Sequence, residues 1–286
     1  MIPYFLGGPF WSFNDWKGNF YSKSAATSSF LEEYSSVFNT VEAGSTFYAL
    51  PKKDSVKKWR DSVPDSFRFI FKIPKRITHE LKLRDCQKEL SEFLSIMEPV
   101  HDVTGMLHIQ LSRGFKGEQF EDLKAFIDIC TDELPWAVEV RHKDFFDQSV
   151  YEKQLDEFLV KKSVTRIHFN TSALFKKSPD TMTLQESQSK KPQNPDRWSV
   201  TTPNPTIRFI SCDELDQSLK DCSRLLQATA YWIEQGLTPY ILLHSPGNKI
   251  TPELCRKFHK VLQRKVDMEG LDIFPGEKNF QPDLFG

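Results

Sequence analysis

Short apolar runs alternate with longer amphipathic stretches along most of this chain. The runs have the length of strands and are rich in β-branched and aromatic residues, whereas the stretches repeat hydrophobic residues at helical spacing. Such alternation is typical of a parallel sheet whose strands are joined by crossover helices. Eight strands are predicted, at residues 3–7, 37–43, 67–73, 105–111, 136–141, 164–169, 206–210 and 239–244. Helices are predicted near residues 25–36, 53–62, 85–98, 117–132, 151–161, 213–235 and 251–266.

This succession predicts an α/β fold, a (β/α)8 TIM-type barrel that forms a single domain over residues 1–275. The alternative is an open doubly wound sheet, in which a glycine-rich phosphate-binding turn would be expected after the first strand. Gly7-Gly8-Pro9-Phe10 is no such turn. The long loop at 171–205, after the sixth strand, contains five prolines and little helical period. A loop in this position lies over the active-site face of a barrel, so it is a candidate lid, with a disordered insertion as the alternative.

Several predicted strands have one apolar face and one face that turns polar toward the carboxyl end. In residues 105–111, for example, Met106, His108 and Gln110 alternate with apolar neighbours. Because the carboxyl ends of barrel strands meet at one face, their polar residues are expected to converge there. The converging set is Glu42, Lys72, Gln110, Glu139, Arg141, His168, Arg208 and His244.

Two interpretations of this set stay open, a self-satisfied network of charges and a functional pocket. Buried charges are costly unless they are paired or used. In the pocket interpretation Lys72, Arg141 and Arg208 hold an anionic small ligand, with Gln110 and His244 beside them. Glu139, His168 and Glu42 are the candidate acid/base residues. A divalent metal on Glu139, His168 and His244 is a minority interpretation, because cations surround these residues and no H-x-H or H-E-x-x-H spacing supports it.

Composition bears on the partners and the cellular compartment of the protein. The formal net charge of −1 argues against strong unspecific binding to nucleic acid. No apolar stretch approaches the roughly 18 residues of a membrane span. The five cysteines are odd in number and form no C-x-x-C pair, which favours reduced thiols in a cytoplasmic protein.

Blocks of the sequence resemble the YecE-like family, domain-of-unknown-function family 72. These blocks are Trp16-Lys17-Gly18-Asn19-Phe20-Tyr21, FNTVEAGSTFYALP at 38–51, FKIPKRITHE at 71–80, Ile109-Gln110-Leu111 and AVEVRH at 137–142. The resemblance implies a TIM-type barrel and no particular reaction. It also places Tyr48 and His79 on motif positions and adds them to the candidate ligand-binding residues. The chain departs from the family pattern at Gly44, at Ser112-Arg113 and at Ile210-Ser211, where the family usually has Asn, Pro-Pro and His-Gly.

The polar tail at 276–286 carries a separate signal. Residues Gln281-Pro282-Asp283-Leu284-Phe285 resemble the peptide by which bacterial replication and repair proteins dock on the sliding DNA clamp. Leu284 and Phe285 would enter a hydrophobic groove while Gln281 hydrogen-bonds at its rim, and docking of this pair on the protein's own barrel is the alternative. Two functions are therefore predicted: an enzyme of hydrolase or phosphoesterase type acting on an anionic or phosphorylated substrate, and a non-catalytic ligand-binding barrel recruited to DNA machinery by its tail.

Overall fold

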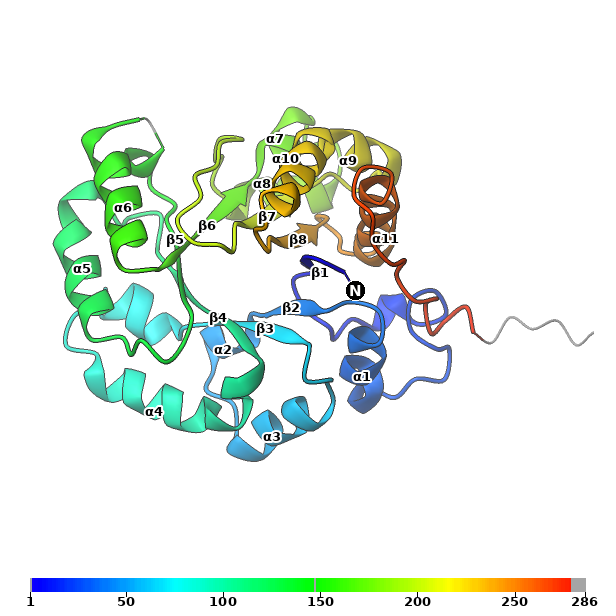
Figure 1. Ribbon diagram of the computed structural model, residues 1–286, viewed down its shortest axis with the longest axis horizontal. Coiled ribbons are helices and arrows are strands. Elements are labelled where there is room, and N and C mark those ends of the chain that lie inside the picture. The colour runs from blue at the N-terminus through cyan, green and yellow to red at the C-terminus, as the bar shows by residue number, and fades with distance from the viewer. Residues whose placement is uncertain (1, 147, 279–286) are drawn as a thin grey trace, which may run out of the picture.

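The predicted barrel is present in the computed structural model, which describes residues 2–146 and 148–278. Eight parallel strands form one sheet in the order β1-β8-β7-β6-β5-β4-β3-β2, and helices surround it (Figure 1). The strands are β1 Phe5–Gly7, β2 Thr40–Ala43, β3 Arg68–Lys72, β4 Thr104–Gln110, β5 Trp136–Glu139, β6 Thr165–Asn170, β7 Thr206–Ile210 and β8 Tyr240–His244. Each lies within a segment predicted to be a strand, or within one residue of it, because the period of the apolar residues changes there.

The helices follow the predicted pattern with several differences, of which three are described below. The α-helices are α1 Phe30–Ser35, α2 Ser45–Tyr48, α3 Lys53–Asp61, α4 Gln87–Met97, α5 Phe120–Asp128, α6 Val150–Lys161, α7 Ser172–Lys176, α8 Met182–Lys190, α9 Leu215–Asp221, α10 Ser223–Glu234 and α11 Thr251–Leu262. The 3-10 helices are η1 Asn14–Trp16, η2 Thr27–Ser29, η4 Glu98–Val103, η5 Gly117–Gln119 and η6 Lys143–Phe145, and η3 Arg76–Glu80 is a π-helix.

The first two differences shorten or divide predicted helices. The helix predicted at 117–132 ends at Asp128, and the helix predicted at 213–235 is divided at Cys222. The third difference lies in the segment 171–205, which contains α7 and α8. These two helices are short and are separated by Pro179, so the sequence shows too few turns to reveal a period.

The barrel is closed by a seam between β1 and β2, where one side chain replaces part of the ladder. Asn39 accepts from the backbone N–H of Leu6 at 2.8 Å and donates to the carbonyl of Tyr4, also at 2.8 Å. The N–H of Glu42 donates to the carbonyl of Gly8 at 3.1 Å. Gly7 is required here because a Cβ would lie 1.9 Å from the Thr40 carbonyl oxygen. Strands β1 and β2 therefore approach more closely than any side chain at residue 7 would allow.

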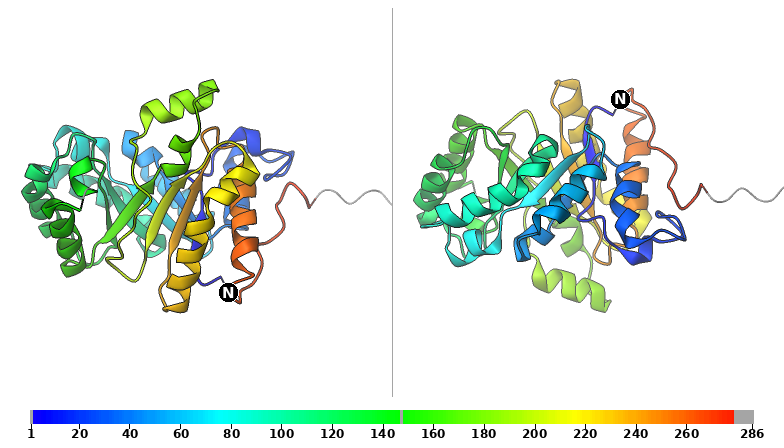
Figure 2. Two further views of the ribbon diagram at one scale, coloured as in Figure 1. Left: turned by 90° about the horizontal axis from the view of Figure 1, so that it is seen from above. Right: turned by 90° about the horizontal axis from the view of Figure 1, so that it is seen from below.

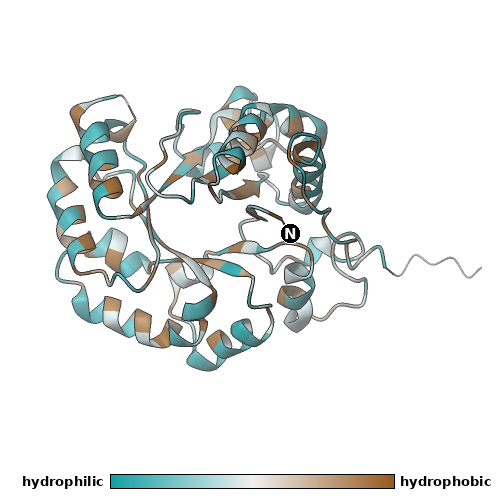
Figure 3. Ribbon diagram, in the orientation of Figure 1, coloured by the Kyte–Doolittle hydropathy of each residue, from teal (hydrophilic) through white to brown (hydrophobic). Residues whose placement is uncertain are grey.

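The hydrophobic core has two parts on the two sides of the sheet, and a third cluster joins α7 and α8 to the ends of β6 and β7. The larger part fills the layer between the strands and the helices, and Figure 3 shows the helices striped in teal and brown, as expected of amphipathic helices that bury one side. The smaller part fills the barrel interior toward the amino ends of the strands. It consists of Ile70, Met106, Ala137, Ile167, Tyr240 and Leu242, with Phe5 packed against it.

The first block of the family motif builds part of the outer core. Trp16 packs edge-on against Phe20, with ring centroids 5.8 Å apart, and Tyr21 stacks on Phe30 at 4.3 Å. Phe274 near the carboxyl end contacts the Phe20 ring at 4.9 Å. This motif therefore fixes the loop after β1 to α1 and to the end of the described chain rather than contributing polar groups to a site.

Two further sequence predictions concern regions outside the barrel wall. The peptide with Gln281, Leu284 and Phe285 lies outside the described residues. Within residues 2–146 and 148–278, no helix combines the length and apolar character that crossing a membrane requires. All five cysteines lie in the described ranges and are free thiols.

Substitution Asn39→Ala is expected to weaken the seam. It leaves the Leu6 N–H and the Tyr4 carbonyl without their partner, and each unpaired group costs about 1–3 kcal/mol when buried. We expect the free energy of unfolding, measured with urea, to fall by about 2–4 kcal/mol. Asn14→Ala, at an exposed position, is the control and should change it little. Equal values for the two variants would show that Asn39 does not close the barrel.

Candidate functional site

Polar side chains from five strands meet inside the barrel toward the carboxyl ends of the strands. Glu42 is on β2, Lys72 on β3, Gln110 on β4, Glu139 on β5 and Arg208 on β7. They lie on the same strand parity as the apolar residues of the barrel interior, such as Ile70 on β3 and Met106 on β4. Parity in the sequence therefore predicted this convergence correctly for these strands.

Arg208 is the centre of the cluster. Its guanidinium pairs with both carboxylates: Nη2 donates to Glu42 Oε1 at 3.0 Å, and Nε contacts Glu42 Oε2. Nη1 donates to Glu139 Oε2. Arg208 is only 3% exposed, Glu42 2% and Glu139 0%. One buried cation thus joins carboxylates that belong to two different strands.

Two more cations lie closer to the solvent. Lys72 Nζ is 2.7 Å from Glu42 Oε1. Arg141, two residues beyond Glu139, donates from Nε to Glu139 Oε1 at 2.6 Å and from Nη2 to Gln110 Oε1 at 2.8 Å. Both side chains are mostly buried but keep some exposure, 12% for Lys72 and 16% for Arg141. They are the ion-paired groups of the cluster that a ligand at the mouth would meet first.

An aromatic ring supports two of these guanidinium groups. The Phe169 ring centroid is 4.7 Å from the Arg208 Cζ and 4.9 Å from the Arg141 Cζ. A cation over an aromatic face is attracted by the ring quadrupole, and the attraction grows when water is excluded. The predicted converging set contains His168, which would put the adjacent Phe169 on the opposite, helix-facing side of β6. The structure corrects this, because the Phe169 ring lies against the two arginines inside the barrel.

Electrostatics hold both carboxylates in the ionised form. Burial by itself would raise the pKa of Glu42, but Arg208 and Lys72 outweigh it and hold the pKa well below the ordinary value. Burial would likewise raise the pKa of Glu139, but Arg141 and Arg208 outweigh it and hold that pKa far below its ordinary range. Neither carboxyl therefore has a proton to give at neutral pH.

Two histidines of the cluster are neutral. Burial lowers the pKa of His108, although Glu139 opposes the shift from 3.4 Å. Burial and then Arg208 lower the pKa of His244 well below its ordinary value. Among the described residues, neither ring nitrogen of His108 and not the Nε2 of His244 has a hydrogen-bond partner. His108 was missing from the predicted site, although its place between Met106 and Gln110 on the interior parity was the signal for it.

His168 does not join the others. Residues Ile167 and Phe169 take the interior parity of β6, so His168 points to the outer side of the barrel wall. There its Nε2 accepts from the backbone N–H of Ser199 at 3.0 Å. Burial and then Arg166 lower the pKa of His168 to about 3. The segment at 192–205 covers the outer side of β6 and gives its polar side chains hydrogen-bond partners, such as Ser199 for His168. Polar residues on β6 therefore did not mark the side that faces the barrel interior.

The two motif residues at the rim differ in exposure. Tyr48, at the end of α2, is 82% exposed. His79, on η3, lies edge-on to Phe47 with ring centroids 5.0 Å apart, and its Nδ1 is 2.9 Å from Thr78 Oγ1. Burial and then Arg141 lower the pKa of His79 to about 4. The charge of Arg141 thus reaches His79, whereas the Tyr48 side chain stands in solvent.

Lys191 is a further cation that sequence reasoning missed. It follows α8, is partly buried, and donates from Nζ to Ser187 Oγ at 2.6 Å. Burial lowers its pKa to about 8, and Arg208, Lys190 and Arg141 add to the shift while Glu186 opposes it. Lys191 therefore lies within the field of the two arginines. No local pattern in residues 171–205 signals this, because the position of Lys191 depends on how α7 and α8 fold back over the barrel.

The donor set does not resemble a metal site. In the described part of the chain, no three His, Cys, Asp or Glu side chains come together in an arrangement that would hold a metal ion. The Glu42 and Glu139 oxygens face the guanidinium of Arg208 instead of an open position. Cations already occupy the places where a divalent ion would need negative charge.

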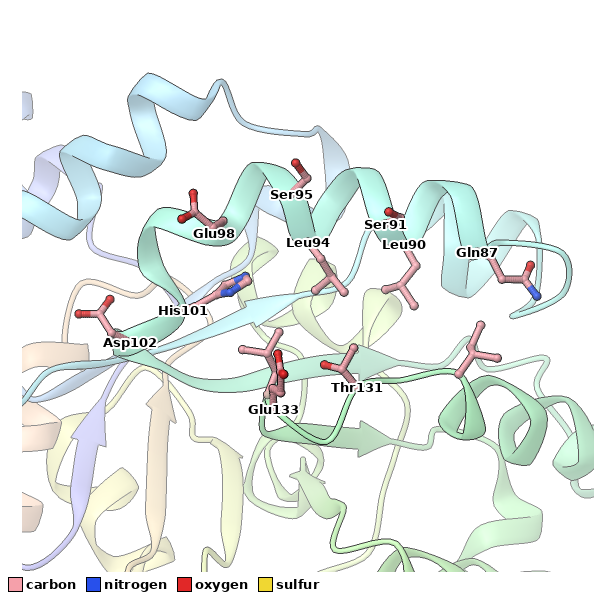
Figure 4. Close-up of a pocket in the computed structure, with 12 residues that line it drawn as sticks. Gln87, Leu90, Ser91, Leu94, Ser95, Glu98, His101, Asp102, Thr131 and Glu133 are labelled. Atoms are coloured by element: carbon pink, nitrogen blue, oxygen red, sulfur yellow. The ribbon is translucent and has the colours of Figure 1, made fainter.

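A groove elsewhere on the surface is separate from this cluster. It has a volume of about 690 Å³ and lies between α4 and the chain that follows α5, with Leu90 and Leu94 on one wall and Thr131 and Glu133 on the other (Figure 4). The groove opens where α5 ends at Asp128 and the chain turns toward β5. None of the converging strand-end residues lines it.

Fold and cluster together define a class: a (β/α)8 barrel with a buried ion-pair cluster at the carboxyl ends of its strands. A family model described as "Protein of unknown function DUF72" matches residues 5–276, so the chain belongs to that family. It is 35% identical over 262 residues to the UPF0759 protein YecE of Escherichia coli K12, covering 92% of this chain and 93% of that protein.

Solved structures of the family share the fold. A DUF72 family protein from Enterococcus faecalis V583 matches with a TM-score of 0.68 and 20% identity, over 94% of this chain and 98% of that one. A DUF72 family protein from Thermotoga maritima matches with a TM-score of 0.63 and 21% identity, over 91% of this chain and 98% of that one. These likenesses confirm the barrel and carry no information on a reaction.

Removal of Arg208 is expected to destabilise the barrel. Arg208→Met leaves two buried carboxylates without their shared partner, which typically costs about 3–5 kcal/mol. The loss in free energy of unfolding should be largest at pH 7. It should shrink as the pH falls toward 4.5, because the carboxyls, whose pKa the arginine no longer lowers, then bind protons and lose their charge.

Urea unfolding at the two pH values measures this difference. Arg84→Met is the control, since Arg84 pairs with Asp122 at the surface and its loss should have no measurable effect. If Arg208→Met were no more destabilised than Arg84→Met, or if its deficit grew at low pH, the account of the cluster would be wrong.

Proposed function

We propose that this barrel is an enzyme acting on an anionic or phosphorylated small molecule at the carboxyl ends of its strands, with hydrolase or phosphoesterase chemistry. The observation that carries the proposal is the composition of the cluster. Three cations, Lys72, Arg141 and Arg208, share two ionised carboxylates. Guanidinium and ammonium groups that keep partial exposure suit carboxylate or phosphate oxygens.

The charge distribution of the whole face supports an anionic ligand. The loops that leave the carboxyl ends of the strands contain sixteen Lys and Arg residues and ten Asp and Glu residues, an excess of six positive charges. These loops are residues 8–29, 44–52, 73–86, 111–119, 140–149, 171–191, 211–214 and 245–250. Because the formal net charge of the chain is −1, the rest of the protein is negative. A field of this kind concentrates anions at the mouth.

The acid/base role is assigned to His244. Its ring is neutral at physiological pH and no ion pair among the described residues occupies it, so it is the group of the cluster left to accept a proton, although burial and Arg208 lower its pKa and make it a weak base. Glu42 and Glu139 are less suited to this role because Arg208 occupies both of them. His168 is turned away from the mouth by its contact with Ser199. The carboxylates instead hold the cations in place.

A cytoplasmic location belongs to the same proposal. The five cysteines are free thiols, which is usual for proteins of a reducing compartment, where disulfides are rare.

A second candidate function rests on the carboxyl-terminal peptide with Gln281, Leu284 and Phe285. In this proposal the barrel binds its anionic ligand without turnover, and the peptide recruits it to the bacterial DNA clamp. Its support is the match of five residues near the end of the sequence. Both functions share the anion-binding mouth, so they differ in turnover and in recruitment.

Arg141→Ala tests the anion site. We expect sulfate binding, measured by isothermal titration calorimetry, to weaken by about 10- to 100-fold, because a charged hydrogen-bond donor is lost. Glu139→Gln should change affinity as well, since it releases Arg141 and Arg208 from a carboxylate. Arg113→Ala is the matched control, an exposed arginine on the same face. The proposal fails if Glu139→Gln and Arg141→Ala leave anion binding and any detected turnover unchanged.

The double substitution Leu284→Ala/Phe285→Ala tests recruitment. We expect the wild-type chain to be retained by immobilised clamp and the variant to be lost, because the two side chains supply the apolar contact with the groove. Gln281→Ala should weaken retention less. Equal retention of wild type and double variant would remove the second candidate function without affecting the first.

A further inference from the structure

The mouth of the barrel holds more positive charge than its carboxylates balance. Glu42 and Glu139 face Lys72, Arg141 and Arg208, and Lys191 adds a fourth cation. The neighbouring histidines add none, because burial keeps His244 and His108 neutral. Two carboxylates against four cations leave two positive charges in a partly desolvated place. Such an excess is unfavourable until an anion enters it.

Lys191 is the cation whose charge is least compensated. Within the described ranges no carboxylate forms an ion pair with it, and its ammonium donates to the hydroxyl of Ser187. The adjacent Lys190 is different, since it is exposed and paired with Glu186. Groups on several elements act on Lys191: Arg208 on β7 and Arg141 after β5 repel its charge, and Glu186 on its own helix attracts it. Lys191 and the neutral His244 on β8 also lie within each other's field.

The segment that carries Lys191 is placed to meet a ligand. Helices α7 and α8 project beyond the strands at one end of the barrel (Figure 2). Their undersides are fixed by apolar contacts, because Leu174 of α7 and Leu184 of α8 pack with Phe169 and Ile210 at the ends of β6 and β7. Phe169 is the residue whose ring lies under Arg141 and Arg208. The lysine and the two arginines are therefore supported by one packed unit.

We propose that the mouth binds a dianionic tetrahedral group, such as a phosphate monoester, and that Lys191 completes this site by binding it in the protonated form. This inference rests on the proposed function and adds to it the charge of the ligand and the residue that senses it. Two negative charges match the excess of two positive charges. When the anion binds, it favours the ammonium form of Lys191, so a proton is taken up wherever the free lysine is partly neutral.

The pH dependence follows from the direction of the shift. Well below pH 8, Lys191 is almost fully protonated in the free protein, so binding takes up almost no proton there. Above pH 8 it is increasingly neutral, and binding must protonate it, so the apparent affinity falls by up to about tenfold per pH unit. An anion site built from arginines alone would show no such dependence between pH 6.5 and 9. Lys72 is the other lysine of the cluster. Burial lowers its pKa while Glu42, 2.7 Å away, opposes the shift, so the loss of proton uptake in a Lys191→Arg variant separates the two lysines.

Sulfate is the probe, because it stays dianionic over this pH range and takes up no proton itself. Calorimetric titration at pH 8 in two buffers of different ionisation enthalpy should show uptake of about half a proton per sulfate, and titration at pH 6.5 should show none. Perchlorate, a tetrahedral monoanion of similar size, should bind more weakly than sulfate. Equal affinity for perchlorate and sulfate would overturn the assignment of a dianion.

Three variants separate the role of Lys191 from general electrostatics. Lys191→Met should weaken sulfate binding at pH 7 by about 10- to 100-fold and abolish proton uptake at pH 8. Lys191→Arg should keep the affinity and lose the proton uptake, since its guanidinium stays charged. Lys190→Met, which removes the adjacent surface charge, should behave as wild type. Thermal unfolding of each variant confirms that it is folded.

The outcomes distinguish the inference from the function on which it rests. Wild-type affinity in Lys191→Met, or proton uptake that persists in Lys191→Arg, overturns the inference. If Arg141→Ala still weakens sulfate binding in that case, the proposed function stands. If neither Arg141→Ala nor Lys191→Met affects sulfate binding, both fail.

Discussion

The interior of this barrel depends on the ion pairs that Arg208 forms with Glu42 and Glu139. The single guanidinium of Arg208 pairs with two carboxylates, from β2 and β5, strands separated by two others in the sheet order. Below it the interior is apolar, and an eight-stranded barrel has room inside for side chains only. Burial therefore favours the neutral forms of Glu42 and Glu139. The paired cations outweigh burial and keep both carboxylates ionised.

The charge of the mouth follows from this arrangement. Arg208 is used by the carboxylates, which leaves Lys72 and Arg141 as the outer members of the same network. Their remaining exposure and the approach of Lys191 make the outer layer more positive than the inner layer is negative. If the proposed function holds, stability and anion recognition draw on the same ion pairs. A substitution in the inner layer disturbs both, whereas a substitution at Lys191 is expected to affect recognition alone.

The fold was predictable because it depends on periodicity, which each segment of sequence displays by itself. Glu42, Lys72 and Glu139 were predictable for the same reason, since parity along a strand decides which side chains face the interior. His168 was wrongly predicted to face the barrel interior. Alternation along a strand shows that its two faces differ in polarity, but not which of them faces the interior. A polar outer face on β6 is unusual and arises from the segment at 192–205, which binds His168 through Ser199. Lys191 was out of reach, because its place depends on tertiary packing of two short helices.

Positions at which this chain departs from the family pattern lie at the edge of the cluster rather than within it. Ile210, in place of the usual histidine, packs with Leu174 and Leu184 and so supports α7 and α8. Gly44 has φ −73°, a conformation open to any residue, so the backbone does not require a glycine there. A Cβ at this position would lie 3.9 Å from Glu42 Oε1 and 4.0 Å from Lys72 Nζ, which is ordinary contact. A larger side chain at residue 44 would extend from there over the ion pair of Glu42 and Lys72. Residues 44 and 210 therefore border the cluster, and neither takes part in the ion pairs of Glu42, Glu139 and Arg208.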